Sequence, residues 1–347
     1  MGLRYDWTNH FHDHFNFAPR GSIAYSPGTK TTVFRAGAGV FYDKPGPAPY
    51  GDVLASRPGG VQRIVLSNPG YPAPFAADAA VAPPSIVQFA PDIRVPYLTQ
   101  YSAGVERQVR KGTTVALTYI GSKGSLFRSR DVNAPLPPLY AARPDPTYGV
   151  VRQIESAGRQ QADALQATLR GRVTKWFNGQ AQYTLGRTYN DSGGLNSFPA
   201  NDYDLSGEWA RADFDRRHRF QLLGRIVPGR LFDLGIGLSV QSGAPYSESI
   251  GADVLHNARG GARPAGVSRN SREGGGYASL DVRAAKDVTF AKGTPRARTL
   301  TISIDAFNVV NQVNYTGYVG TIGSPLFGQP IVARPPRQLQ VSTHLKF

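Results

Sequence analysis

Hydrophobic and polar residues alternate with a period of two along much of the chain. After residue 231, alternate positions are apolar and the positions between them are small or polar: Phe232, Leu234, Ile236, Leu238 and Val240 against Asp233, Gly235, Gly237, Ser239 and Gln241. Successive side chains of a strand point to opposite faces, so this pattern predicts a two-faced strand. In a helix the same pattern would spread apolar groups around the whole cylinder.

The same alternation recurs and predicts twelve strands. We place them at residues 2–8, 18–26, 31–42, 98–109, 113–122, 161–172, 179–189, 216–227, 232–243, 277–288, 298–311 and 336–347. Most have about the length that crosses a bilayer on a tilt, roughly 9–11 residues. Residues 148–156 also look like a strand. A further membrane strand there would break the up-and-down order, so we expect a hairpin within an external loop.

Short and long connections alternate between these strands. The short ones are 27–30, 110–112, 173–178 and 228–230, and the long ones are 43–97, 123–160, 190–215, 245–275 and 312–335. Transmembrane barrels have short periplasmic turns and long external loops, whereas loops this long are unusual in a compact soluble domain. We therefore predict an all-β protein, an antiparallel transmembrane β-barrel of the outer membrane, whose last strand ends on the periplasmic side.

Composition narrows the class of protein. Mean hydropathy is −0.32, and no stretch approaches the roughly 18 apolar residues of a spanning helix, which excludes a helical membrane protein but not a barrel. The net charge of +15 would suit nucleic-acid binding. The arginines are scattered singly, however, and a basic lumen or loops facing anionic lipopolysaccharide explain the charge equally well. We expect membrane lipid and lipopolysaccharide as partners, and no nucleic acid. Cysteine is absent, which excludes disulfides and thiolate metal sites.

The chain ends in a strand pattern that closes on an aromatic residue. Val341, Thr343, Leu345 and Phe347 occupy alternate positions. A terminal aromatic after alternating apolar positions is the usual signal for the barrel-assembly machinery, which we expect as a partner. The alternative is an ordinary last strand that happens to end in Phe347.

Seven motifs spread from about residue 15 to the end give the chain a family resemblance. They are Asn16–Arg20, Val40–Asp43, Tyr119–Gly124, Asp131–Pro135, Asp213–Phe220, Gln241–Tyr246 and Ala306–Asn311. In them the chain resembles TonB-dependent transporters of the Oar-like type, which carry a carboxypeptidase-regulatory domain. The resemblance implies a barrel of about 22 strands filled by a plug domain, of the size of the largest plugged barrels.

On that resemblance, residues 1–347 form a partial barrel domain of about twelve strands. The signal peptide, regulatory domain, plug and TonB-binding segment are not among them, so we expect a fragment. The expected function is uptake of an unidentified ligand, with TonB acting through a plug. The alternatives are a non-energised pore, a surface binding or adhesion protein and, less favoured, a soluble basic β protein.

Two groups of residues could form binding sites. His10, His12 and His14 would share one strand face and could hold zinc or nickel. A polar, aromatic loop at the membrane rim is the simpler interpretation, and we expect no metal and no cofactor. Asp213–Phe220 could bind phosphate, but its alternating acids and bases favour pairing that anchors a long loop to the barrel wall.

We also looked for aromatic residues that could bind sugars and for motifs typical of enzymes. Seven aromatic residues near strand ends could stack on sugars, but they suit an interfacial girdle better: Tyr25, Phe41, Tyr42, Tyr101, Tyr119, Tyr183 and Tyr189. The sequence has no nucleophile elbow, zinc-protease motif or phosphate-binding loop, so we predict that the protein is not an enzyme. A lipase-like pair of His218 or His344 with a neighbouring serine is the remaining alternative.

Overall fold

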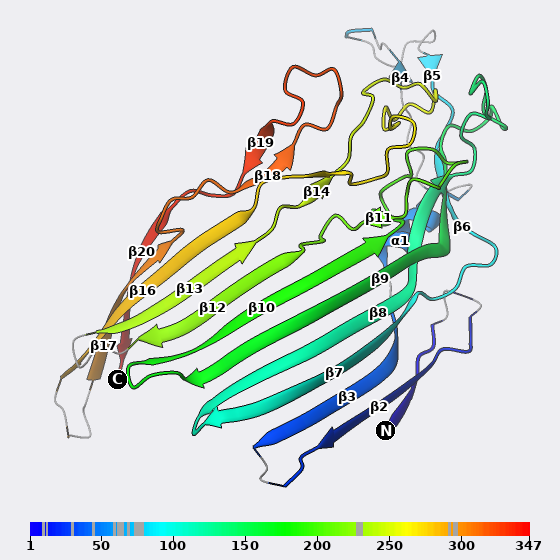
Figure 1. Ribbon diagram of the computed structural model, residues 1–347. Coiled ribbons are helices and arrows are strands. Elements are labelled where there is room, and N and C mark those ends of the chain that lie inside the picture. Colours follow the sequence, from blue (N-terminus) through cyan, green and yellow to red (C-terminus); the bar gives the residue numbers. More distant parts are fainter. Residues whose placement is uncertain are drawn as a thin grey trace.

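The computed structural model describes residues 1–347 apart from 9, 10, 12, 29, 30, 44, 45, 58, 59, 61–65, 68, 69, 73–79, 227–231, 291, 292 and 294–297. One large sheet dominates it (Figure 1). A single short helix, α1 (Ala48–Ala55), occurs among the described residues. Within that part of the chain, no helix is long and apolar enough to cross a membrane.

Twelve strands follow one another through the sheet in sequence order, each antiparallel to its neighbours. They are β1 (Gly2–Tyr5), β2 (Phe17–Tyr25), β3 (Thr32–Tyr42), β7 (Tyr97–Arg110), β8 (Thr113–Asp131), β9 (Val151–Arg172), β10 (Phe177–Asn190), β12 (His218–Ile226), β13 (Asp233–Gln241), β16 (Tyr277–Phe290), β17 (Arg298–Phe307) and β20 (Gln338–Lys346). The twelve predicted strands and the antiparallel order are confirmed.

The register aligns the apolar positions of neighbouring strands into one continuous surface. One row of directly paired residues runs Val105, Leu117, Ala167, Tyr183, Phe220, Val240 and Ala278. The adjacent row, on the other side of the sheet, runs Gly104, Thr118, Gln166, Thr184, Arg219, Gln241 and Tyr277. We call these two sides the apolar face and the polar face. An apolar outer face opposite a polar lumen is what a membrane barrel requires.

The height of the apolar face fits a bilayer. On β10 the apolar face carries Phe177, Gly179, Ala181, Tyr183 and Leu185 before the first charge, at Arg187. Eight residue steps of about 3.4 Å give roughly 27 Å along the strand. A tilt of about 35–45° reduces this to roughly 20 Å across the membrane, near the height of about 25 Å seen in outer-membrane barrels.

The short connections lie at one end of the strands and the long connections at the other end (Figure 1). Short connections at 26–31, 111–112, 173–176, 227–232 and 291–297 alternate with longer ones at 6–16, 43–96, 132–150, 191–217, 242–276 and 308–337. The alternation of short and long connections is confirmed. Of the predicted turns, 228–230 and part of 27–30 lie outside the described residues.

Residues 148–156 were predicted to form a hairpin within an external loop, and the structure confirms the antiparallel pairing but not a separate hairpin. Residues 151–156 are the first part of β9 and pair with the last part of β8, as far as Asp131. The ladder passes an irregularity between Leu126 and Arg128 and continues, so the alternation there belongs to the same long strand. A short strand, β6 (Ile86–Phe89), adds to β9 in parallel at this end. The predicted loop 123–160 therefore shrinks to 132–150.

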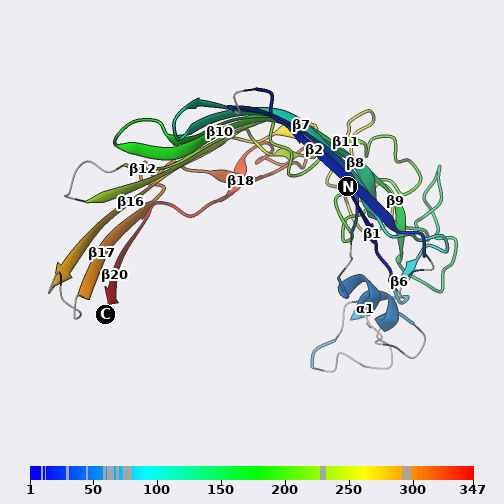
Figure 2. The same ribbon diagram turned by 90° about the horizontal axis from the view of Figure 1, so that it is seen from below.

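The sheet bends into an open arch (Figure 2). Strands β1 and β20 form its two edges, and each pairs with one neighbour only among the described strands. The main buried apolar cluster consists of Phe11, Val95, Phe127 and Ile154. It joins the long-loop ends of β8 and β9 to the β1–β2 and β3–β7 connections, so it supports the loops rather than the membrane-spanning wall.

Candidate functional site

The long connections fold together beyond one end of the strands (Figure 1). Short strands pair within and between them: β11 (Ala210–Arg211) with β10, β14 (Pro245–Tyr246) with β15 (Arg272–Glu273), and β18 (Tyr315–Tyr318) with β19 (Pro330–Ala333). An isolated bridge between Ser249 and Thr321 joins two different connections. These pairings give the loops a fixed arrangement, and we call residues 132–150, 191–217 and 242–276 together the loop cluster.

Asp131 holds the base of the 132–150 connection. Its side chain is fully buried, and its carboxylate accepts hydrogen bonds from the backbone N–H groups of Asn133 and Val151, both at 3.0 Å. The Arg143 guanidinium donates to the same carboxylate at 2.9 Å. The Asn133 side-chain amide donates to three backbone carbonyls of this connection, including that of Asp145 at 2.9 Å. Polar contacts therefore shape this loop.

A second group of ion pairs ties the 191–217 connection to the 242–276 connection. Glu208 is buried and accepts from Arg263 at 2.6 Å. Arg269, whose side chain is 8% exposed, donates to Asp213 at 3.0 Å and to the carbonyl of Asn190 at 2.8 Å. Because buried charges are costly unless paired, these contacts fix the two connections against each other.

Burial shifts the titration of two of the loop groups. Burial raises the pKa of the Asp202 carboxyl above its ordinary value, and the neighbouring Arg259 guanidinium opposes this effect. Asp202 also accepts a hydrogen bond from the backbone N–H of Asp131 at 2.8 Å. Burial lowers the pKa of the Arg269 guanidinium, although Asp213 and Glu208 partly offset the shift.

A polar cavity of about 460 Å³ lies between the two connections. Its charged lining consists of three arginines and three carboxylates: Arg259, Arg263, Arg269, Glu208, Asp213 and Glu248. Two buried nitrogens of Arg259, Nε and Nη1, have no hydrogen-bond partner among the described residues. A second cavity of about 370 Å³ adjoins it at Ala200 and Arg263. This arrangement can bind a polar ligand through charge-assisted hydrogen bonds.

The Asp213–Phe220 segment anchors a loop, as its alternating charges predicted. Asp215 is buried and accepts from the Thr188 N–H and from Arg211, both at 2.8 Å. Arg216 donates to the carbonyls of Asp213 and Asp215. These contacts attach the end of the 191–217 connection to β10 and β11, so the anchoring interpretation is confirmed.

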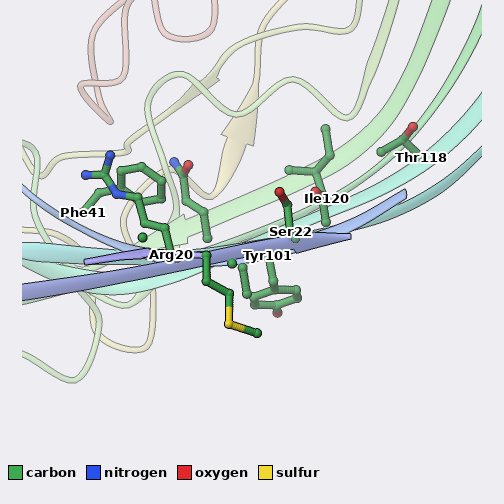
Figure 3. A pocket seen from close by; sticks show the side chains of 14 residues that line it. Arg20, Ser22, Phe41, Tyr101, Thr118 and Ile120 are labelled. Carbon is green, nitrogen blue, oxygen red and sulfur yellow. The ribbon is translucent and has the colours of Figure 1, made fainter. Parts of the chain in front are cut away.

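Six of the seven aromatic residues of the predicted girdle lie on the apolar face, and their position at the membrane interface stays a prediction. The register places Tyr25, Tyr42, Tyr101, Tyr119, Tyr183 and Tyr189 on the apolar face. Phe41 is the exception, because it alternates with Tyr42 and lies on the polar face. Figure 3 shows Phe41 beside Arg20 on one side of the sheet and Tyr101 on the other. The Arg20 guanidinium lies 4.2 Å from the centre of the Phe41 ring.

The histidines form no chemical constellation in the part of the chain that the structure describes. His10 and His12 lie outside it. His14 is exposed, and its backbone carbonyl accepts from the Tyr5 hydroxyl at 2.9 Å. No group of three His, Cys, Asp or Glu side chains there could hold a metal. His218 pairs through Nδ1 with the Tyr183 hydroxyl at 2.7 Å, and His344 lies on the polar face.

The four residues of the predicted assembly signal lie at the open edge. Val341, Thr343 and Leu345 of β20 pair with Ile304, Ile302 and Leu300 of β17. They belong to the apolar face, and Phe347 follows the strand at 94% exposure. Their role in assembly stays a prediction.

Sequence reasoning missed the ion pairs that hold the arginines of the cavity. Glu208 and Arg263 are 55 positions apart, and Asp202 and Arg259 are 57 apart. Arginines and acids in two neighbouring long loops were a visible signal, but their spacing does not specify which partners meet.

Comparisons with known proteins place the chain among barrels. A family model described as an outer membrane beta barrel domain matches residues 4–226, more than half of the chain. No curated protein matches the sequence.

Solved structures of outer-membrane proteins share the fold. The outer membrane transporter YddB from Escherichia coli matches with a TM-score of 0.63 and 12% identity, over 99% of this chain and 42% of its own. A mutant ferric enterobactin receptor, PfeA, from Pseudomonas aeruginosa in complex with enterobactin matches with a TM-score of 0.56 and 13% identity, over 95% and 41%. The ferripyoverdine receptor of the same organism, bound to ferripyoverdine, gives 0.53 and 12%, over 94% and 32%. The chain thus spans less than half the length of these proteins.

Proposed function

Because the chain belongs to the family of outer membrane β-barrel domains, we propose that it forms about half of the barrel wall of a TonB-dependent receptor of the Oar-like type. Such a receptor takes up a scarce ligand from outside the cell. The remaining strands and a plug domain would come from the rest of the polypeptide. Location in the outer membrane follows from the family and the fold.

The observation that carries the proposal is the twelve-stranded open sheet, which has one continuous apolar face and all its long loops at the same end of the strands. Two unpaired edges within a bilayer are costly, because lipid offers no hydrogen-bond partners. We therefore expect further strands to complete the wall. YddB is a precedent, because the match with this chain covers only 42% of the YddB chain.

The loop cluster is the part that we assign to ligand selection. Loops held by a rigid scaffold commonly carry binding residues. Here the scaffold extends to the loops, because β8 and β9 continue to Asp131 and Val151. The polar face, with Arg170, Gln182 and Arg219, would line the lumen and contact a plug.

Topology gives the first test, and the absence of cysteine makes it clean. Single cysteines would replace Ala141 in the loop cluster and Lys111 in a short turn, both of them exposed. In intact cells, a membrane-impermeant maleimide should label A141C and leave K111C unlabelled until the outer membrane is broken. Labelling of K111C in intact cells would contradict the orientation.

Energy coupling gives the second test. The purified natural polypeptide should bind the periplasmic domain of TonB in detergent, and it should give no steady ion current in planar bilayers because its plug fills the lumen. A steady current without TonB binding would contradict the receptor and support a non-energised pore.

A further inference from the structure

At the long-loop end, charged side chains return on the apolar face of β8, β9 and β10. One cross-strand row contains Tyr119, Leu165 and Leu185, and the next contains Gly121, Asp163 and Arg187. The row after that pairs Lys123 with Gln161. Apolar side chains thus give way to charged ones within two residues on β9 and β10 and within four residues on β8, and we take this change as the external boundary of the bilayer.

Asp163 fixes the position of Arg187. Its carboxylate accepts from the Tyr119 hydroxyl at 2.6 Å and from the Gln161 amide at 3.3 Å. The Arg187 guanidinium approaches it through Nε, at 3.5 Å, while the arginine side chain remains 56% exposed. The described residues provide no other ion pair for Arg187, so its two terminal nitrogens are left to bind an external anion.

Two further cations belong to this end of the strands. Lys123 and Arg217 are exposed, and neither side chain makes a hydrogen bond or ion pair in the described part of the chain. Arg217 borders a groove of about 220 Å³ that is also lined by Tyr119, Leu165, Leu185 and Arg187. The groove thus combines an apolar floor with a cationic rim of Arg187 and Arg217 around one carboxylate, Asp163. Lys123 lies one cross-strand row farther out on the same face.

We propose that this groove binds lipopolysaccharide of the outer leaflet. Arg187 and Lys123 would contact a phosphate group of the lipid, and an acyl chain would lie on Leu165 and Leu185. The charge and the position select this occupant, because a site on the lipid side of the wall, at the external boundary, meets a phosphorylated lipid first. The inference depends on the outer-membrane location and not on ligand uptake, so each can fail without the other.

The test measures lipid binding to the complete natural polypeptide in mild detergent by native mass spectrometry. The probe is purified lipopolysaccharide, compared with the same lipid after enzymatic removal of its phosphates. The double variant K123Q/R187Q should bind the intact lipid at least about tenfold more weakly, the ratio that one charge-assisted hydrogen bond provides. R187K keeps the charge and should retain most of the affinity.

A matched control removes two arginines from the same face at the opposite boundary. Arg107 and Arg298 lie on the apolar face near the short turns and are exposed. The variant R107Q/R298Q should bind like the wild type, and heat-modifiable migration in gels should show that all variants are folded.

Three results would overturn the proposal: equal binding by K123Q/R187Q, equal loss in R107Q/R298Q, or equal binding of the dephosphorylated lipid. Displacement of the lipid by millimolar inorganic phosphate would also contradict it, since the site would then recognise a free anion rather than a lipid.

Discussion

Asp131 offers a direct test of how the loop cluster is held. We predict that Asp131→Asn loosens the 132–150 connection without unfolding the barrel. The carboxylate is fully buried and accepts two backbone N–H groups and the Arg143 guanidinium. The asparagine has nearly the same shape, but it loses the charge and turns an N–H₂ group toward donors.

The magnitude follows from burial. Removing one partner of a buried ion pair costs about 3–5 kcal/mol. The Arg143 side chain is 19% exposed and can partly regain water, so we expect the lower end, about 3 kcal/mol. At about 1.4 kcal/mol per factor of ten, local opening of this connection should become roughly a hundredfold more frequent.

Hydrogen exchange read by mass spectrometry measures that opening on the complete natural polypeptide in detergent. Peptides covering 132–150 should lose protection, while those from the membrane-spanning part of β10 should not. The control is Asp233→Asn, since Asp233 and Arg225 pair at 2.6 Å but are 40% and 63% exposed. Exposed ion pairs contribute under about 1 kcal/mol to stability, so hydrogen-exchange rates in Asp233→Asn should change less than about fivefold. Unchanged protection in Asp131→Asn, or equal effects of the two variants, would refute the reasoning.

Three further predictions concern pH, packing and assembly. Burial raises the pKa of Asp202 above its ordinary 3.8, so its contribution to loop stability should be fully present below that value and decline as pH rises through the raised pKa. Exchange protection of the loop cluster measured across this range should show the decline, and Asp202→Asn should flatten it. Gly224→Ala should destabilise the barrel by about 1–3 kcal/mol in urea unfolding, because the new Cβ would lie 2.3 Å from the Phe177 ring. Gly237→Ala, whose nearest atom is 3.6 Å away, should change little, and equal effects would contradict the packing argument. Phe347→Ala should lower the yield of folded protein in outer membranes severalfold, measured by heat-modifiable migration, and an unchanged yield would exclude an assembly role.

The strands could be predicted because each one separates two different environments. Lipid on one side and a polar lumen on the other impose alternation on every strand, so a pattern such as Leu234, Ile236 and Leu238 is visible without any knowledge of partners. Connection lengths then gave the orientation of the strands. Both signals are local in the sequence.

The errors arose where local pattern was insufficient. Residues 151–156 alternate like a separate strand, and only their pairing with β8 shows that they begin β9. Phe41 and Tyr42 are both aromatic and adjacent, so only the register tells which one meets lipid. The ion pairs of Glu208 and Asp202 join residues more than 50 positions apart and could not be read from spacing.

The polar interior of the protein has a thermal consequence. Among the described residues, twenty-two polar or charged residues are buried, against twelve apolar ones, and many of the polar ones belong to the loop cluster. The heat capacity of unfolding rises with exposed apolar surface and falls with exposed polar surface. Opening of the loop cluster should therefore carry a small heat-capacity change. The stability of the loop cluster should therefore vary almost linearly with temperature. Cooling should stabilise these loops, whereas it weakens the burial of a hydrophobic core.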